Sequence, residues 1–149
     1  MPLAPQQTRT FFVTTATANR RRLFQVERNA ELFLEVLNQN RAKGRFHLHA
    51  FVIMPDHIHL LLTPSAEIAL EKAMQFIKGG FSFQLKSQHE VWTRSFNEHR
   101  IQTPHDYQHH VAYIEQNPVR AHLTEKPQDY KFSSSTIPNL KDPCPSWLS

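Results

Sequence analysis

The sequence predicts an α+β domain in two layers, with helices packed on an antiparallel sheet. Segments rich in β-branched and aromatic residues alternate with segments whose apolar residues recur at helical spacing. Their order is strand, helix, strand, strand, helix, strand, helix. The chain has 149 residues, 40% of them hydrophobic and 20% charged, which suffices for the core of one domain. We therefore expect a single domain over 1–149, with a mostly irregular tail from about residue 136.

The first half of the chain predicts a strand, a helix and a hairpin. Thr10–Ala16 is β-branched and aromatic, which is typical of a strand. Asn29–Lys43 carries apolar residues at helical spacing and stops at a glycine. Phe46–Met54 and His57–Thr63 flank a Pro-Asp dipeptide, which predicts a tight hairpin.

The second half predicts two further helices around one strand. Ile68–Leu85 is amphipathic, and its Gly79-Gly80 pair indicates a kink or a close approach. Trp92–Ile101 predicts a strand with poor alternation. Pro104–Asn117 predicts a helix that ends before Pro118, because the residue before a proline disfavours the α region.

Composition limits the class of protein. A net charge of +4 and a pI near 9.5 permit a nucleic-acid partner without requiring one. The single cysteine, Cys144, excludes an internal disulfide and fits a reducing compartment. We see no signal peptide and no apolar run of about 18 residues, so we expect a soluble, cytoplasmic protein without a membrane partner.

His57 and His59 lie two residues apart in the most hydrophobic segment of the chain. Strand side chains alternate between faces, so both imidazoles project from one side, about 6–7 Å apart along the backbone. Two polar rings on an apolar strand are costly without partners. The pair is therefore a candidate for binding one divalent metal ion.

A second pair with the same spacing, His47 and His49, precedes the turn. If the turn contains two residues, Val52 pairs with His59, and His47 and His49 point to the opposite face. The two pairs then cannot share a metal, and only one can face the last helix. Spacing alone does not decide which pair is functional.

In the last predicted helix, Tyr113 lies one turn after His109 and one turn before Asn117. Residues four apart share a helix face, so these three side chains line up, whereas Tyr107 falls on another face. A carboxamide at Asn117 can bind a metal through its oxygen. The alternative interpretation is that Tyr113 is a core aromatic and that Asn117 is a helix-terminal residue before a proline.

Two segments in this order resemble a known family. Met54-Pro-Asp-His-Ile-His-Leu-Leu is followed about fifty residues later by Tyr113-Ile-Glu-Gln-Asn-Pro-Val-Arg. Over roughly residues 9–135 the chain resembles the REP-associated tyrosine transposases, small single-tyrosine members of the HUH single-strand DNA endonuclease superfamily. Either segment alone would be a weak signal.

The resemblance implies a ferredoxin-like sheet, metal ligands at His57, His59 and Asn117, and a nucleophile at Tyr113. It implies a metal-dependent single-stranded DNA endonuclease and strand transferase that works through a 5′-phosphotyrosine intermediate on hairpin-forming repeat DNA. The expected cofactor is Mg²⁺ or Mn²⁺, a hard ion that polarises the scissile phosphate. The earlier histidine pair is then structural.

The expected partner is single-stranded or hairpin DNA similar to a repetitive extragenic palindrome, bound by a monomer or by a homodimer that exchanges the tyrosine helix. Binding of this kind pairs cations with aromatic side chains on which bases stack. The candidate DNA-binding cations are Arg20, Arg21, Arg22, Lys78, Arg94, Arg100 and Arg120. For any one of them alone, a solvated surface charge is the simpler interpretation.

Two other interpretations remain at this point. One is a catalytically inactive protein that binds DNA hairpins, such as a domesticated repressor. The other is a sheet protein whose histidines only bond one another. The intact His57, His59 and Tyr113 favour the enzyme, in which His109 or His110 could serve as general base.

Overall fold

The computed structural model describes residues 5–149, so the first four residues of the predicted domain lie outside the described part. Its centre is a four-stranded antiparallel sheet with the strand order β2-β3-β1-β4. The strands are β1 (Phe11–Ala16), β2 (Phe46–Ile53), β3 (His57–Pro64) and β4 (Asn97–Arg100). This order places β3 and β1 in the middle of the sheet, where both faces can be covered.

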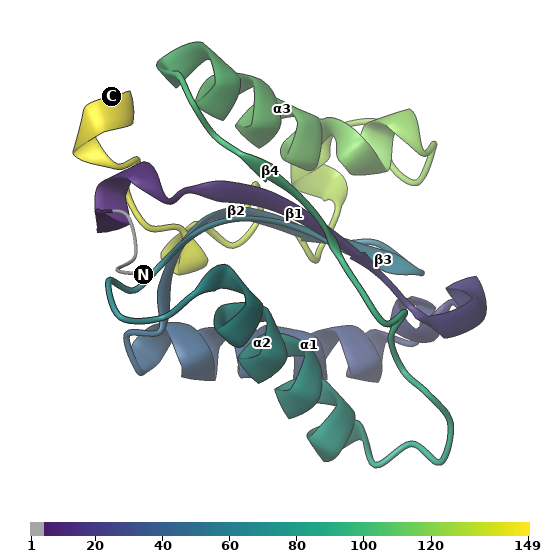
Figure 1. Cartoon of the computed structure of the whole chain (residues 1–149). Helices are drawn as coiled ribbons and strands as arrows, with labels where there is room; N and C mark the ends of the chain where they lie inside the picture. The colour runs from purple at the N-terminus through teal and green to yellow at the C-terminus, as the bar shows by residue number, and fades with distance from the viewer. Residues whose placement is uncertain (1–4) are drawn as a thin grey trace.

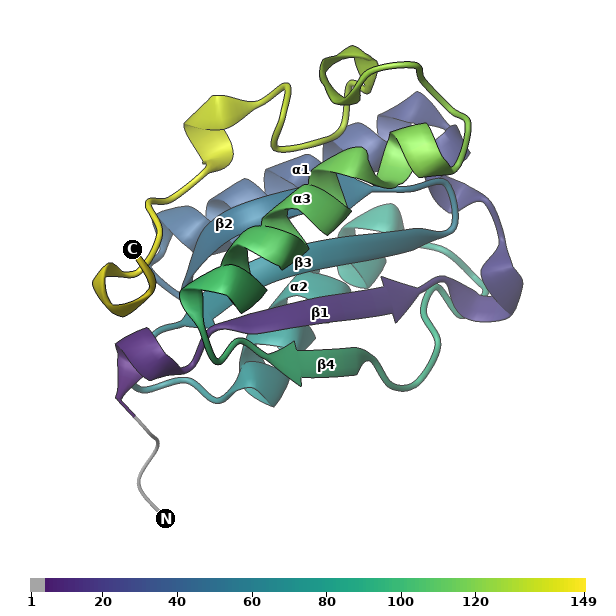
Figure 2. The same ribbon diagram turned by 90° about the horizontal axis from the view of Figure 1, so that it is seen from above.

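Helices cover both faces of this sheet (Figures 1 and 2). α1 (Glu27–Ala42) and α2 (Leu70–Leu85) lie against one face, and α3 (Pro104–Arg120) lies along the other. The unit β1-α1-β2-β3-α2-β4 with this strand order confirms the predicted ferredoxin-like α+β sandwich. α3 adds a further layer on the opposite face, which the order of elements alone does not place.

The larger core fills the space between the sheet and α1 and α2. Fully buried side chains in it include Phe33, Leu37, Phe51, Leu60 and Phe81. α2 continues through Gly79 and Gly80, so the predicted close approach is found and the kink is not. A Cβ at Gly80 would lie 3.2 Å from Cγ1 of Val36, which means that α1 and α2 pack closely because this position has no side chain.

A smaller apolar cluster holds α3 on the sheet. The strands contribute Ala50, Val52, Met54 and Leu61, and the helix contributes Tyr107 and Ile114. Together with the buried Pro118, the two helix residues form a stripe that fixes the rotation of α3 about its axis. Tyr113 and Asn117 each precede a residue of this stripe, so they are turned by about 100° from it.

The hairpin has the predicted two-residue turn and register, with Val52 opposite His59 and Met54 N–H bonded to His57 O at 2.8 Å. A β-bulge between Leu48 and Ala50 interrupts the ladder. The bulge turns His49 to the α3 face, where its Nε2 lies 2.8 Å from the Thr63 hydroxyl oxygen. The prediction that His47 and His49 point to the opposite face is therefore wrong, because it assumed an unbroken ladder. Beyond the bulge His47 pairs with Thr63, which lies on the same face of β3 as His59.

Two predicted boundaries also differ. α3 does not end before Pro118 but continues to Arg120, with Ala121 N–H closing the last turn onto Asn117 O at 3.0 Å. Asn117 is therefore fully helical. The predicted strand Trp92–Ile101 shortens to β4, because the Trp92 ring is buried against the larger core and its Nε1 donates to Lys78 O at 3.0 Å.

The C-terminal segment has three short 3₁₀ turns and lies along β2. Ile53 N–H donates to Phe132 O and Ser134 N–H donates to Phe51 O, both at 2.9 Å. Further along, Asp142 forms a two-point ion pair with Arg41 of α1, at 2.8 and 2.9 Å. No helix in the described part of the chain combines the length and apolar character needed to cross a bilayer.

His49 makes stability depend on pH. The residue is 1% exposed, and burial is the main cause that lowers its pKa to about 4. Because the unfolded chain binds a proton near pH 6.5 and the folded chain does not, stability is full above that pH and falls as pH drops towards 4. We expect the titration of His49 to lower the free energy of unfolding by about 2 kcal/mol between pH 7 and pH 5. Denaturant unfolding at both pH values measures this loss.

The His49→Gln variant is the matched comparison, since glutamine can still bond the Thr63 hydroxyl but does not titrate. Comparing pH 7 with pH 5 within each protein cancels any change in baseline stability. The variant should lose about 2 kcal/mol less than the wild type over this interval. Equal losses in both proteins would show that His49 does not stay neutral in the folded state.

Candidate active site

The predicted catalytic and metal-binding side chains all border one open depression on the α3 side of the sheet. Its volume is about 410 Å³. The residues that line it are Thr14, Arg20, Met54, His57, His59, Tyr113, Asn117, Arg120 and Ala121. They come from β1, the segment after it, the hairpin and the C-terminal half of α3. The fold therefore brings together residues that are about 100 positions apart in the sequence.

His59 is the buried member of the histidine pair. It is 5% exposed in the central strand β3, and its Nδ1 lies 2.8 Å from the Thr14 hydroxyl oxygen across the β1–β3 ladder. Burial, and then the positive fields of His57, Arg120 and Arg20, lower its pKa to about 3. The ring is therefore neutral, which is the form that binds a metal, and its Nε2 remains available as a ligand atom.

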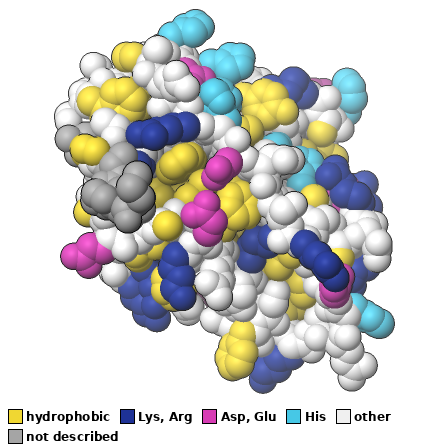
Figure 3. All heavy atoms as spheres, in the orientation of Figure 1, with side chains coloured by type: hydrophobic (Ala, Val, Ile, Leu, Met, Phe, Trp, Pro, Cys, Tyr) yellow, Lys and Arg dark blue, Asp and Glu magenta, His cyan; other side chains and the backbone are white. Residues whose placement is uncertain are grey.

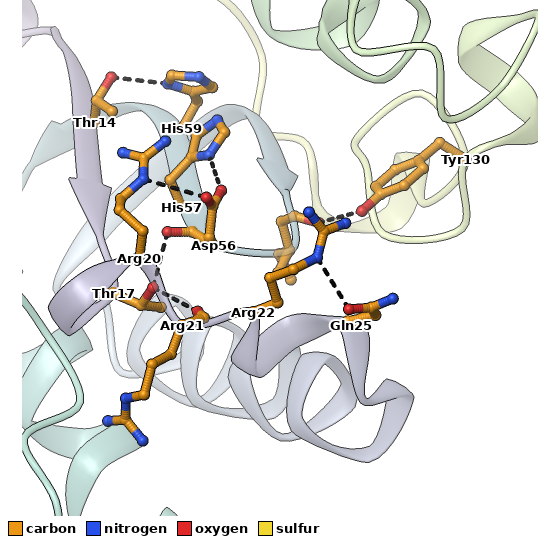
Figure 4. A network of polar contacts seen from close by, with 11 residues as sticks. Thr14, Thr17, Arg20, Arg21, Arg22, Gln25, Asp56, His57, His59 and Tyr130 are labelled. Atoms are coloured by element: carbon orange, nitrogen blue, oxygen red, sulfur yellow. Dashed lines mark hydrogen bonds and ion pairs between the residues drawn. The ribbon is translucent and has the colours of Figure 1, made fainter.

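His57 is held in a similar way by its neighbour Asp56 (Figure 4). Its Nδ1 lies 2.8 Å from Asp56 Oδ1, and the other carboxylate oxygen accepts from Arg20 Nε at 3.2 Å. Burial alone would raise the pKa of Asp56, but the hydrogen bond from His57 and the charge of Arg20 hold that pKa below its usual range. A carboxylate on Nδ1 leaves Nε2 of His57 as the outward ligand atom.

The two rings and Asn117 make a donor set that fits a divalent ion. The ring centroids of His57 and His59 are 4.8 Å apart, and Asn117 borders the same depression. Two imidazole nitrogens and one carboxamide oxygen leave positions open for phosphate oxygens and water, as a catalytic metal site requires. The Asp56 carboxylate at His57 Nδ1 sets the tautomer of that ring for this role, and the Thr14 hydroxyl at His59 Nδ1 fixes the orientation of the second ring.

Tyr113 points towards the histidines rather than into the core. The residue is 38% exposed, and its ring lies edge-on to His59, with ring centroids 5.6 Å apart. The Cζ atom of Arg120 lies 4.1 Å from the tyrosine ring centroid, and Arg120 Nη2 donates to Tyr113 O at 2.8 Å. Tyr107, the other tyrosine of α3, is buried beside His49. The helix thus presents one tyrosine to the depression.

The candidate DNA-binding cations separate into two groups. Arg20 and Arg120 line the depression. The others lie outside it: Arg21 donates to Glu90 O, Arg22 to Gln25 Oε1, Lys78 to Thr93 O and Arg100 to Thr8 O, while Arg94 is exposed. Backbone carbonyls already engage three of these cations, which favours a structural role for them.

Three residues at this site are not among the predicted ones. Asp56 and Thr14 orient the histidines, and Phe12 contacts His59, His110 and Tyr113, with ring centroids 5.4, 4.7 and 5.7 Å apart. Asp56 directly precedes the histidine pair in the sequence, which is a signal that could have identified it. Thr14 and Phe12 belong to another strand, and only the β1–β3 register reveals them.

Residues 8–117 match the family model described as "Transposase IS200 like". This match spans most of the chain. The chain belongs to the IS200-like transposase family. It is therefore an enzyme of the tyrosine transposase class, as the two sequence segments indicated, and the resemblance to REP-associated tyrosine transposases is confirmed.

Individual relatives agree with this assignment. The REP-associated tyrosine transposase of Escherichia coli (strain K12) is 29% identical over 126 residues, which are 84% of this chain and 75% of the relative. A putative REP-associated tyrosine transposase of Haemophilus influenzae (strain ATCC 51907 / DSM 11121 / KW20 / Rd) is 31% identical over 103 residues, 60% of this chain and 58% of the relative. About three residues in ten are thus identical between this transposase and each of these two relatives over the aligned segments.

Solved structures share the fold. A REP-associated tyrosine transposase bound to a REP hairpin matches with a TM-score of 0.78 at 24% identity, over 97% of this chain and 90% of that one. A putative transposase from Deinococcus radiodurans matches with a TM-score of 0.55 at 18% identity, over 90% and 92% of the two chains. At these identities the likeness concerns the fold of the transposase.

Asp56 should control metal affinity without touching the ion. Asp56→Ala removes the carboxylate that sets the tautomer and orientation of His57, so we expect Mn²⁺ binding to weaken about 10- to 100-fold. Isothermal titration of Mn²⁺ measures the change. Asp129→Ala, at an exposed carboxylate distant in sequence, is the matched control and should bind as the wild type does. An Mn²⁺ affinity within twofold of wild type for Asp56→Ala would contradict this orienting role.

Proposed function

We propose that this transposase is a metal-dependent single-stranded DNA endonuclease and strand transferase with Tyr113 as its nucleophile. The observation that supports it is the convergence of Tyr113 with the two oriented histidines and Asn117 on one open depression. A tyrosine buried in the core, or histidines that only bonded each other, would not produce this arrangement.

We further propose that the substrate is repeat DNA that folds into a hairpin next to a single-stranded segment. Two observations support this choice. The E. coli relative is named for its association with REP sequences, and the structural neighbour is bound to a REP hairpin. The basic character of the chain, with a net charge of +4, suits a polyanionic substrate.

The chemistry follows from the side chains present. A Mg²⁺ or Mn²⁺ ion held by His57, His59 and Asn117 would polarise the scissile phosphate and offset its negative charge. The Tyr113 oxygen attacks phosphorus, the bond from phosphorus to the 3′-oxygen breaks, and that oxygen leaves as a 3′-hydroxyl after taking up a proton. The 5′-phosphate is then joined to Tyr113. A second 3′-hydroxyl can reverse the step without ATP, because the phosphotyrosine retains the energy of the phosphodiester.

Arg120 is placed to hold the scissile phosphate. Its guanidinium lies over the Tyr113 ring at the edge of the depression. A guanidinium suits a phosphate because it offers several N–H donors in a planar fork. Neither candidate general base borders the depression: His109 is exposed, and His110 Nδ1 lies 3.0 Å from the Asp106 carboxylate. The tyrosine proton is therefore expected to leave through water.

Tyr113→Phe should abolish the covalent intermediate, because it removes one oxygen and leaves the ring packing on His59 and Phe12 in place. With a labelled single-stranded oligonucleotide that carries a hairpin and with Mn²⁺ present, wild type should form an adduct that resists denaturant. The variant should form at least 10³-fold less adduct, since the oxygen that attacks phosphorus is missing. Denaturing gel electrophoresis measures the adduct.

Tyr107→Phe is the matched control, because it removes a hydroxyl from the same helix at a buried site. It should form the adduct at the wild-type level. His57→Gln should form no adduct yet bind DNA, since phosphate contacts supply most of that affinity. If wild type binds the oligonucleotide but forms no adduct with any divalent ion, the chain is an inactive hairpin-binding protein instead.

Arg120→Gln should weaken binding of the same oligonucleotide and reduce its dependence on salt. A cation that contacts one phosphate contributes about one unit to the slope of log affinity against log salt, or somewhat less for a single strand. Arg28→Gln is the control, because Arg28 lies on α1 at the other face of the sheet. Fluorescence anisotropy at several salt concentrations measures both slopes. Identical slopes for the two variants would rule out a phosphate contact by Arg120.

A further inference from the structure

A second group of metal-binding side chains lies beside the candidate active site. It consists of His99 on β4 and of Asp106 and His110 on α3. One ligand atom from each residue can be chosen so that all three lie within 4.8 Å of one another. None of the three borders the depression around Tyr113. This group is therefore separate from the proposed catalytic ligands.

We propose that His99, Asp106 and His110 bind a second divalent ion, of the Zn²⁺ class, which ties α3 to the edge strand β4. The ion would have a structural role. The proposal does not depend on whether Tyr113 cleaves DNA. We refer to these three residues as the β4–α3 cluster.

The distances in the β4–α3 cluster suit a shared ion. His99 Nε2 lies 2.9 Å from Asp106 Oδ2 and 3.1 Å from Asp106 Oδ1, and His110 Nδ1 lies 3.0 Å from Oδ1. Two ligands about 2.1 Å from one tetrahedral ion are about 3.4 Å apart, so the widest pair would close by up to about 1.4 Å. His99 can supply this movement, because its side chain is 46% exposed on an edge strand.

The cluster is also reachable from solvent. The side chains of Asp106 and His110 are 21% and 15% exposed, so each is mostly covered and still partly open to solvent. Histidine side chains gather on the α3 side of the molecule in the space-filling view (Figure 3). Asp106 Oδ2 accepts from Gln102 N–H at 3.0 Å, which fixes the carboxylate at the start of α3. An ion would thus find one ligand already positioned.

Without an ion, N–H···O hydrogen bonds to Asp106 join the two histidines of the β4–α3 cluster. His110 Nδ1 lies 2.8 Å from Asp106 O as well as 3.0 Å from its carboxylate, so its N–H can donate to either. An ion would bind the two ring nitrogens that face Asp106, His99 Nε2 and His110 Nδ1, and the single proton of each neutral ring would then be carried by its other nitrogen. Two imidazoles and one carboxylate favour Zn²⁺ over Mg²⁺, which prefers oxygen ligands.

An ion here would restrain the part of α3 that precedes Tyr113. His110 contacts Phe12 with ring centroids 4.7 Å apart, and the same phenylalanine ring lies edge-on to Tyr113. His99 and His110 are also stacked, with ring centroids 4.8 Å apart. A bond from β4 through the ion to the helix would therefore hold the α3 turn next to the tyrosine more firmly on the sheet.

The test counts Zn²⁺ bound by the full chain in equilibrium dialysis. The His57→Gln/His59→Gln variant removes the imidazoles of the candidate active site and should still bind one Zn²⁺ per chain. Adding His99→Ala should reduce that binding at least tenfold. Adding His105→Ala instead, at an exposed histidine next to the cluster, should leave it unchanged. Hydrogen exchange of the α3 amides should slow with Zn²⁺ and not do so after His99→Ala.

Asp106→Asn provides a second variant that keeps an oxygen for the Gln102 N–H and removes the charge, and it should also lose the ion. If the double active-site variant does not fold by near-ultraviolet circular dichroism, the same count in the wild-type background should fall from two Zn²⁺ to one with His99→Ala. A folded double variant that binds no Zn²⁺, or equal binding with and without His99, would overturn the proposal.

Discussion

The pairing of Thr14 with His59 across β1 and β3 is the interaction on which the candidate site depends. An imidazole in a central strand under a helix loses its contacts with water, which is costly unless a protein group replaces them. The Thr14 hydroxyl does so at 2.8 Å, and the ladders on either side of β3 hold the ring in place. Burial then keeps the ring neutral. The remaining site residues are arranged around this fixed ring.

The positive groups near His59 have two effects that support each other. Arg20 and Arg120 both contribute to lowering the pKa of His59, so they help to keep a neutral ring. The same charges attract a phosphate to the depression that both arginines border. Asp56 compensates only one of them, since it pairs with Arg20. The field at the open edge of the site, where Arg120 covers Tyr113, is therefore positive.

Local pattern was sufficient to predict the elements that carry the site. The turn at Pro55 and the alternation after it gave the Val52–His59 register, and helical spacing placed Asn117 one turn after Tyr113. The bulge that turns His49 to the α3 face could not be predicted, because a bulge depends on packing beneath the strand. The path of α3 through Pro118 was missed for the same kind of reason, since the burial of Pro118 under the helix outweighs the local preference of the residue before it.

The partners of the histidines were beyond local pattern altogether. Thr14 and Phe12 lie about 45 positions from His59, and their contacts exist only once β1 pairs with β3. The resemblance to a transposase family indicated which histidine pair is the candidate metal-binding pair, whereas spacing alone left both pairs possible. The structure adds the physical reason: His49 is occupied by Thr63 and Tyr107, while His57 and His59 border an open depression.

The sequence of α3 explains how one helix serves both the core and the chemistry. Tyr107, Val111, Ile114 and Pro118 follow one another at steps of four, three and four residues; the first three pack on the strands, and Pro118 is buried. Asp106, His110, Tyr113 and Asn117 have the same steps, displaced by one position. The second stripe is therefore turned by about 100° from the first along the whole helix. When the apolar stripe packs on the sheet, the polar stripe is therefore oriented as well. Its residues near the start of α3 then face β4, and those near the end of α3 face His57 and His59.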